Sequence, residues 1–156
     1  MRSPGMPAPR TDTPARTPPL SLLLGYGPAA LLPVLGVLAW MGQPWALEAG
    51  RLWGAAILLF LAGVVRGLSF FTESGPRWPQ LAAMMARFVP GLLALALWLP
   101  AALALLIAGY AGVWLFDPWA ARHGEAPRYF ARLRPPQMMV ALAGLAILLA
   151  RALGWG

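Results

Sequence analysis

The apolar positions of this chain fall in long uninterrupted runs and not in the alternating or two-faced patterns of a soluble domain. Leu52 to Val65 carries no charged residue, and with the residues that follow to Phe71 the run is 20 residues long. At about 1.5 Å per residue, a helix of this length crosses a hydrocarbon core of about 30 Å. The pattern therefore predicts a membrane-spanning helix over 52–71.

A still longer run follows, from Leu81 to Phe116, in which Arg87 is the single charged residue. As one straight helix it would measure about 54 Å, which is too long for one crossing, so we expect it to fold back at Pro100. With the runs on either side, the sequence predicts an all-α integral membrane bundle of five helices. The fourth is short enough to need a thinned membrane or a shallow turn. The predicted spans are 20–41, 52–71, 80–99, 101–116 and 137–153.

The segment 1–19 is rich in proline and arginine and has almost no apolar residue to bury, which predicts a disordered cytoplasmic arm before a membrane domain over 20–156. The first span contains Pro28 and Pro33, so we expect a kinked helix whose freed carbonyls need neighbours or water. This span is too long for the core of a signal peptide and has no small-x-small cleavage site after it. We therefore expect it to be retained.

The longest polar connection, 117–136, is predicted to lie on the cytoplasmic side. Asp117 and Pro118 suit the start of one short helix, and Pro127 suits the start of a second, amphipathic turn at the interface. The proline pair at 135–136 is expected to end that turn before the last span begins.

Composition supports a membrane protein, because 60% hydrophobic and only 11% charged residues would leave a soluble domain short of polar surface. The net charge of +7 would suggest nucleic acid as a partner of a soluble chain. In a membrane protein the arginines serve topology first, so no nucleic-acid partner is expected. The absence of cysteine excludes disulfides and thiolate metal sites.

Arginines are distributed unequally between the two sides of the predicted bundle, which fixes its expected orientation. A cytoplasmic N-terminus and five spans place the C-terminus on the opposite side. We expect the bacterial inner membrane, with the mitochondrial inner membrane as the alternative. The predicted cytoplasmic arginines are Arg2, Arg10, Arg16, Arg77, Arg122, Arg128, Arg132 and Arg134, against Arg51 and Arg151 outside.

Three stretches of the chain are similar to a known family. LGYGPAALLPVLGVLAW at 24–40 has a Gly-rich start and a mid-helix proline, and WGAAILLFLAGVVRGL at 53–68 has Phe-Leu, small residues and a downstream glycine. Asp117, the AP-x-Y pattern at 126–129 and Leu-Arg at 133–134 then precede the last helix. Together they resemble the transmembrane protein 69-like family, a domain of unknown function found in bacteria and mitochondria.

The resemblance covers most of the chain after residue 20 and implies a small multi-span inner-membrane protein, without implying an activity. Arg66 departs from the family pattern, in which an aromatic residue is expected beside the second glycine, and so does the proline pair at 135–136. The tryptophan-rich sensory, translocator-type family has a similar length and helix number. Its signature is absent here, so it serves only as a functional alternative.

Arg66 and Arg87 lie inside predicted spans, each about 9 Å from the cytoplasmic end. A charged side chain costs about 2.5 to 3.5 kcal/mol at a helix centre, and less where it can extend to the interface. One interpretation is that both arginines extend to the interface in this way. The other is that both face inward, with Asp117 as counter-ion, and form a polar pocket for a phosphate or lipid headgroup.

Two further groups of residues carry expectations about packing and lipid contact. Gly63 and Gly67 form a GxxxG step with Ala56 seven residues earlier, which predicts close helix packing either within the chain or in a homodimer. Contact with anionic headgroups is expected for the arginines of the cytoplasmic loop, namely Arg122, Arg128, Arg132 and Arg134.

No set of residues with the pattern of a catalytic, metal or cofactor site is visible, and His123 is the only histidine. We therefore expect no enzyme and no cofactor, but a protein that acts by binding: an accessory or assembly factor, or a scaffold in contact with anionic lipid and with a membrane-protein partner. The alternative is a small-molecule carrier or sensor with its pocket among the first three helices, including Tyr26. A lipid-phosphate enzyme comes third.

Overall fold

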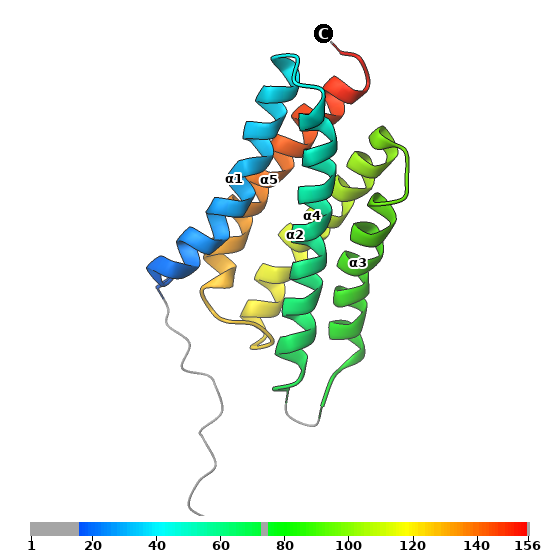
Figure 1. Cartoon of the computed structure of the whole chain (residues 1–156). Helices are drawn as coiled ribbons and strands as arrows, with labels where there is room; N and C mark the ends of the chain where they lie inside the picture. The colour runs from blue at the N-terminus through cyan, green and yellow to red at the C-terminus, as the bar shows by residue number, and fades with distance from the viewer. Residues whose placement is uncertain (1–15, 73–74, 156) are drawn as a thin grey trace, which may run out of the picture.

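The computed structural model describes residues 16–72 and 75–155 and folds them into five α-helices, with no strand in these two ranges (Figure 1). The expectation of an all-helical protein is therefore confirmed. Residues 1–15 of the predicted arm lie outside the described residues. The helices are α1 (Pro19–Trp40), α2 (Trp45–Ser69), α3 (Trp78–Ala94), α4 (Leu99–Arg122) and α5 (Phe130–Ala152).

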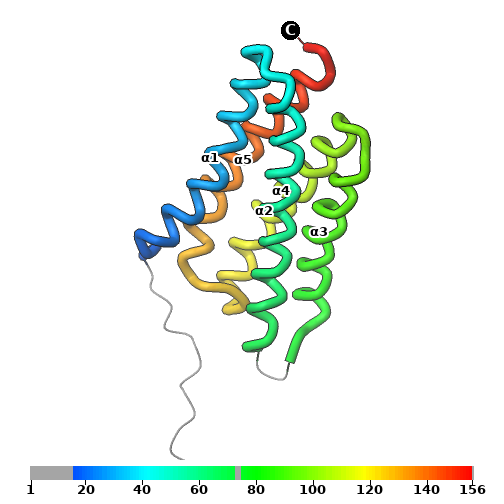
Figure 2. Tube along the Cα trace, in the orientation of Figure 1, coloured from blue at the N-terminus to red at the C-terminus, as the bar shows by residue number. Residues whose placement is uncertain are grey.

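The five helices run alternately up and down in one bundle, as the trace in Figure 2 shows. In this bundle α2 contacts all four other helices, α5 packs between α1 and α4, and α3 packs against α2 and α4. One end carries the start of α1, the end of α2, the start of α3 and the connection 123–129. We call it the basic end. The opposite end carries the turns 41–44 and 95–98 and the end of α5.

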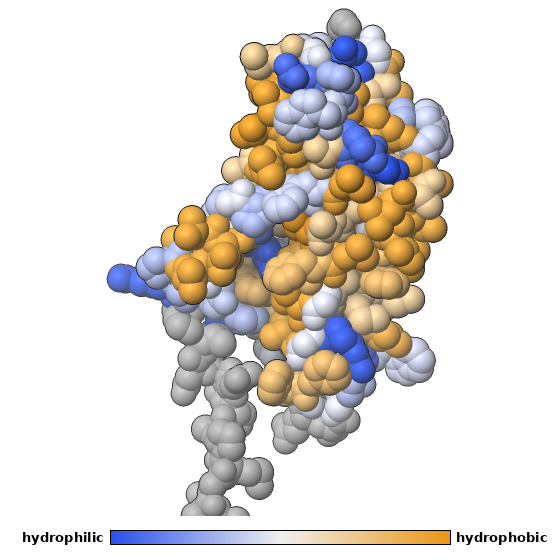
Figure 3. Space-filling model, in the orientation of Figure 1, coloured by the Kyte–Doolittle hydropathy of each residue, from blue (hydrophilic) through white to orange (hydrophobic). Residues whose placement is uncertain are grey.

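Four of the helices, α1, α2, α4 and α5, are long and apolar enough to span a membrane. Only 33% of the most apolar stretch of α1, α2 and α4 is buried inside the bundle, and 44% of that of α5. On the face that Figure 3 shows, the surface is consequently apolar along most of its length, and Phe60 in the middle of α2 is 68% exposed. An apolar exterior of this extent suits lipid and not water.

The predicted break at Pro100 is present, but it divides the long run differently from the expectation. α3 ends at Ala94 after 17 residues, and α4 has 24 residues and continues through Asp117 and Pro118 to Arg122. The predictions of a short fourth helix and of a helix start at Asp117 are therefore wrong. The short helix is α3, about 26 Å long. A proline removes a single helical hydrogen bond, and the Asp117 carboxylate is bound to arginines instead of capping a helix.

α5 also differs from its prediction, since it begins at Phe130 and includes the proline pair at 135–136. The expectation that this pair ends a short helix is wrong. Both prolines lie within the first two turns of α5, where the carbonyls that they free, those of Ala131 and Arg132, are near the basic end of the bundle. Continuation of the helix carries Arg134 inward, where it is buried.

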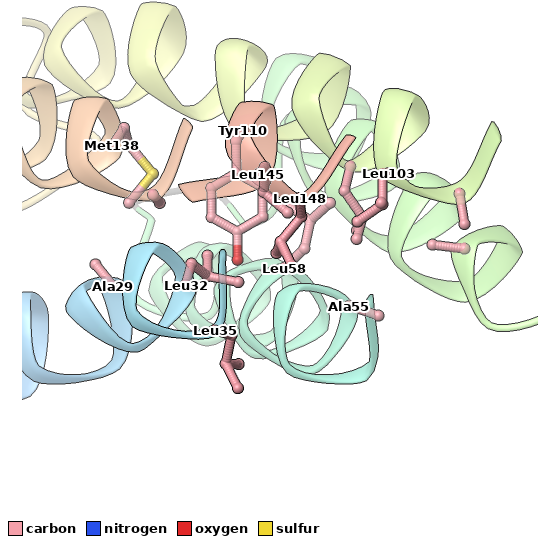
Figure 4. Close-up of a cluster of buried hydrophobic side chains, with 14 of the residues drawn as sticks. Ala29, Leu32, Leu35, Ala55, Leu58, Leu103, Tyr110, Met138, Leu145 and Leu148 are labelled. Carbon is pink, nitrogen blue, oxygen red and sulfur yellow. The ribbon is translucent and has the colours of Figure 1, made fainter. Parts of the chain in front are cut away.

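The core is built around Tyr110, which is fully buried and whose hydroxyl donates a hydrogen bond to the Gly54 carbonyl at 3.0 Å. Figure 4 shows its ring among Leu32, Leu145 and Leu148, which belong to α1 and α5. A polar group in a membrane-embedded core needs such a partner. This hydrogen bond therefore ties α4 to α2 in the centre of the bundle.

Glycines at two helix crossings allow the backbones to approach closely. A Cβ on Gly144 of α5 would collide with the backbone of α1 at Leu32 and Pro33, and a Cβ on Gly54 of α2 would lie 3.0 Å from Leu106. These contacts are the close approaches that small residues permit in membrane bundles.

The predicted GxxxG pair, Gly63 and Gly67, lies outside these two helix crossings. A Cβ on Gly63 or Gly67 would meet nothing within 4 Å, and Ala56 is exposed. The intramolecular packing expected for these residues is thus not what the structure shows. The pair that packs inside the bundle is Gly50 and Gly54, one turn apart on the other side of α2. A homodimer through Gly63 and Gly67 stays a prediction.

Candidate functional site: a buried arginine cluster

Three charged residues from three helices meet inside the basic end of the bundle: Arg87 of α3, Asp117 of α4 and Arg134 of α5. Their exposed fractions are 3%, 7% and 6%. The Arg87 Nη2 donates a hydrogen bond to Asp117 Oδ1, and the Arg134 Nε lies 3.1 Å from Asp117 Oδ2. One carboxylate therefore holds two guanidinium groups. We call these three residues the arginine cluster.

Gln137 connects the arginine cluster to α1. The Arg134 Nη1 donates to Gln137 Oε1 at 3.0 Å, and the Gln137 Nε2 donates to the Gly25 carbonyl at 2.9 Å. The Arg134 guanidinium also lies over the Phe130 ring, 4.4 Å from its centroid. A continuous polar path thus joins α3, α4, α5 and α1, and it fixes their relative positions at this end.

The arginine cluster has donors left over. The Arg87 Nη1 donates to the Ala83 carbonyl at 2.6 Å, but the Nε atoms of Arg87 and Arg134 are buried without a hydrogen-bond partner. The 3.1 Å approach of Arg134 Nε to Asp117 is consequently an electrostatic contact that lacks hydrogen-bond geometry. Two cations and one anion leave a net charge of +1. A buried cluster with a net positive charge and unpartnered donors attracts an anion or water.

A pocket of about 570 Å³ lies beside Arg87, between α2, α3 and α4. Its wall is mostly apolar. Among its polar residues, Gln80 already bonds Thr72 and the Arg77 backbone N–H, at 2.8 and 3.0 Å, and Glu125 lies 3.7 Å from Arg77. The lining residues are Val65, Leu68, Pro79, Gln80, Ala82, Ala83, Ala86, Arg87, Leu115, Phe116, Trp119, Ala120, Glu125 and Ala126.

The four residues expected to share a polar pocket are only partly brought together. Arg87 and Asp117 pair directly. Arg66 is exposed instead, where its Nη1 donates to Ser69 Oγ at 3.2 Å and its guanidinium lies over the Phe70 ring. Tyr26 is half-buried on α1, next to Gly25, and lines neither the arginine cluster nor the pocket beside Arg87.

Of the four arginines expected at the headgroups, Arg122, Arg128 and Arg132 are exposed at the basic end. Arg134 is buried, which corrects its assignment. Gln137 was predicted only as the start of the last span and not as a site residue, because the sequence predicts the end of a helix at the proline pair. The spacing of Arg134 and Gln137, three residues apart, would place both on one face of a continuous helix, and that was the available signal.

Arginines at the opposite end have a different role, since they cap neighbouring helices. The Arg51 Nη1 donates to the carbonyls of Ala94, Leu95 and Leu97 at 3.2, 3.0 and 3.2 Å, and Arg51 also pairs with Glu48. The Arg151 Nε donates to the Ala39 carbonyl at 3.3 Å. Carbonyls at helix C-termini lack intrahelical donors and carry partial negative charge, so these contacts satisfy the ends of α3 and α1.

This geometry defines an all-helical bundle with four helices long and apolar enough to span a membrane. Comparison of the chain with protein-family models, curated proteins and solved structures gives no match. The resemblance to the transmembrane protein 69-like family therefore stays a prediction. No group of three His, Asp or Glu side chains with a metal-binding arrangement occurs within 16–72 and 75–155.

Replacing Gln137 by leucine is expected to lower the free energy of unfolding by about 1 to 3 kcal/mol, because it removes the acceptor of the buried Arg134 Nη1 and the link to α1. Unfolding by denaturant in detergent micelles measures this. Gln43→Leu, at an exposed position in the turn 41–44 between α1 and α2, is the matched control. Equal stability of the two variants would contradict the bridging role of Gln137.

Proposed function

We propose that this protein is a multi-pass membrane protein that acts by binding anionic lipid at its basic end, as an accessory factor or scaffold for another membrane protein. The observation that carries the proposal is the unequal use of arginine at the two ends of the bundle. At the opposite end, Arg51 and Arg151 are bonded to helix carbonyls. At the basic end, cations exceed anions both inside the bundle and on its surface.

The excess at the basic end is large among residues 16–72 and 75–155. The arginines of this end are Arg16, Arg66, Arg77, Arg87, Arg122, Arg128, Arg132 and Arg134, and its acids are Asp117 and Glu125. Guanidinium groups bind phosphate strongly, and clusters of them beside membrane helices attract anionic headgroups at about 1 kcal/mol each.

The same asymmetry supports an orientation in the membrane. Loops rich in arginine remain on the cytoplasmic side, so we place the basic end and the N-terminus there and the C-terminus outside. In this arrangement α3 is a fifth, short span. We place the protein in the bacterial inner membrane, with the mitochondrial inner membrane as the alternative.

A carrier or sensor of a small molecule is the second candidate function. The pocket beside Arg87 favours it, although this pocket lies among α2, α3 and α4 and not among the first three helices. A lipid-phosphate enzyme stays third, because no hydrogen bond described within 16–72 and 75–155 at the basic end pairs a nucleophile with a base.

The protein in nanodiscs of mixed phosphatidylcholine and phosphatidylglycerol is expected to retain phosphatidylglycerol preferentially when it is released for native mass spectrometry. Removal of two exposed charges, in Arg122→Gln/Arg132→Gln, should reduce this preference several-fold. Arg151→Gln removes a charge at the opposite end and should leave the preference unchanged. Equal retention of both lipids by the unmodified protein would overturn the proposed function.

A further inference from the structure

We propose that the pocket beside Arg87 binds one anionic amphiphile, whose charged group lies against Arg87 and whose apolar tail lies between α2, α3 and α4. This inference rests on the proposed function and narrows it from lipid at the surface to one molecule inside the bundle. Three features of the described residues support it: charge, unpartnered donors and the chemistry of the pocket wall.

Charge comes first. The arginine cluster holds two guanidinium groups and one carboxylate, all at least nine-tenths buried. A net positive charge in a medium of low dielectric constant is costly, and a single bound anion makes the cluster neutral. Arg87 is the member of the cluster that lines the pocket, so the anion is expected there.

The second feature is the Nε of Arg87, which is buried and has no hydrogen-bond partner. Its Nη atoms are already engaged by Asp117 and by the Ala83 carbonyl. Buried polar atoms in folded proteins almost always have a partner, so an unpartnered N–H on an arginine that lines the pocket supports an acceptor that arrives with a ligand. Carboxylate and phosphate oxygens accept such charge-assisted hydrogen bonds best.

The third feature is the apolar wall. The pocket is lined by Val65 and Leu68 of α2 and by Leu115 and Phe116 of α4, together with small residues of α3, among them Ala83. A mostly apolar pocket of about 570 Å³ with few polar residues is of the size and character of small-ligand sites. A hydrocarbon chain fits this wall, whereas a polar metabolite would lose its hydration without compensation.

The ligand class is therefore a hydrocarbon chain with one anionic group, either a fatty-acid carboxylate or a lysolipid phosphate. We would measure binding of palmitate, lysophosphatidylglycerol and zwitterionic lysophosphatidylcholine to the full chain in amphipol, by the fluorescence of Trp119 and the other tryptophans. We expect one or both anionic probes to bind at least tenfold more tightly than lysophosphatidylcholine. Binding of palmitate alone assigns the carboxylate, and binding of lysophosphatidylglycerol alone assigns the phosphate.

Two variants locate the site. Ala83→Leu fills the pocket, and Arg87→Gln removes the cation while Asp117 and Arg134 remain as a balanced pair. Each should weaken binding of the anionic probe at least tenfold, whereas Ala104→Leu, the same change as the first on an exposed position of α4, should not. Circular dichroism verifies that each variant is folded.

Unchanged binding to folded Ala83→Leu, or equal binding of all three probes, would overturn the pocket proposal. Neither result affects the phosphatidylglycerol preference in nanodiscs, which depends on the surface arginines. The two proposals can therefore fail independently.

Discussion

Replacing Asp117 by asparagine is expected to lower the free energy of unfolding by about 3 to 5 kcal/mol, the largest of the losses in stability that we predict. The reason is the asymmetry of the arginine cluster. Asp117 is the anion that both buried guanidinium groups contact, so its loss leaves Arg87 and Arg134 as like charges in the bundle interior. The measurement is unfolding by denaturant in detergent micelles.

Charge balance makes this prediction specific. Arg87→Gln leaves a neutral pair of Asp117 and Arg134 and should cost less than Asp117→Asn. The double variant Arg87→Gln/Asp117→Asn restores the original net charge of the cluster and should be more stable than Asp117→Asn alone. Glu125→Gln is the control, since its contact with Arg77 is long, at 3.7 Å, and the Arg77 side chain is exposed to solvent, so that the pair contributes about 0 to 1 kcal/mol. If Asp117→Asn and Glu125→Gln were equally stable, the cluster would not carry a buried charge.

Gly144→Ala is expected to lower the free energy of unfolding by about 1 to 3 kcal/mol or more, although it adds a single methyl group. That methyl group would collide with the backbone of α1 at Leu32 and Pro33, and a backbone yields less easily than a side chain. The two helices would have to separate, which also strains the link from Gln137 to Gly25. Thermal unfolding in micelles, followed by helical circular dichroism, measures the loss.

Gly63→Ala is the matched control for this prediction, because the added methyl group meets nothing within 4 Å. It should fold with unchanged or slightly higher stability, since alanine favours helix over glycine. Loss of stability in Gly63→Ala comparable to that in Gly144→Ala would mean that the outward face of α2 is packed in the membrane, as in a homodimer through Gly63 and Gly67.

Much of the fold follows from the apolar runs, which give five helices, the break at Pro100 and the exposed arginines of the basic end. The wrong helix boundaries come from local sequence rules, by which a proline ends or begins a helix. These rules predict helix boundaries at Pro118 and at the pair 135–136, yet α4 and α5 continue through them. A continuous helix satisfies the remaining backbone groups and brings Asp117 and Arg134 together. The free energy gained from this non-local contact outweighs the local preference of proline against a helix interior.

Of the candidate site, only the pairing of opposite charges could be predicted from the sequence. Arg87 lies inside a predicted span and needs a counter-ion if it faces inward, and Asp117 directly follows the same apolar run, so their pairing was one of the two interpretations of the sequence. Which face of α2 points into the bundle could not be predicted from the sequence. The sequence contains two glycine pairs on this helix, Gly50 with Gly54 and Gly63 with Gly67, and only the partners Leu148, Leu106 and Leu145 determine that the first pair packs.

The central claim is that the positive arginine cluster holds an anionic amphiphile in the membrane. Native mass spectrometry of the protein, released gently from its own membrane beside Arg66→Ala and Arg87→Ala, tests it most directly. The account predicts a retained fatty acid or anionic lysolipid in the unmodified protein and in Arg66→Ala, since Arg66 lies outside the cluster, and its loss in Arg87→Ala, while phospholipid held by the surface arginines is retained by all three. Retention of the same fatty acid or lysolipid by all three proteins, or of none by any, would contradict it.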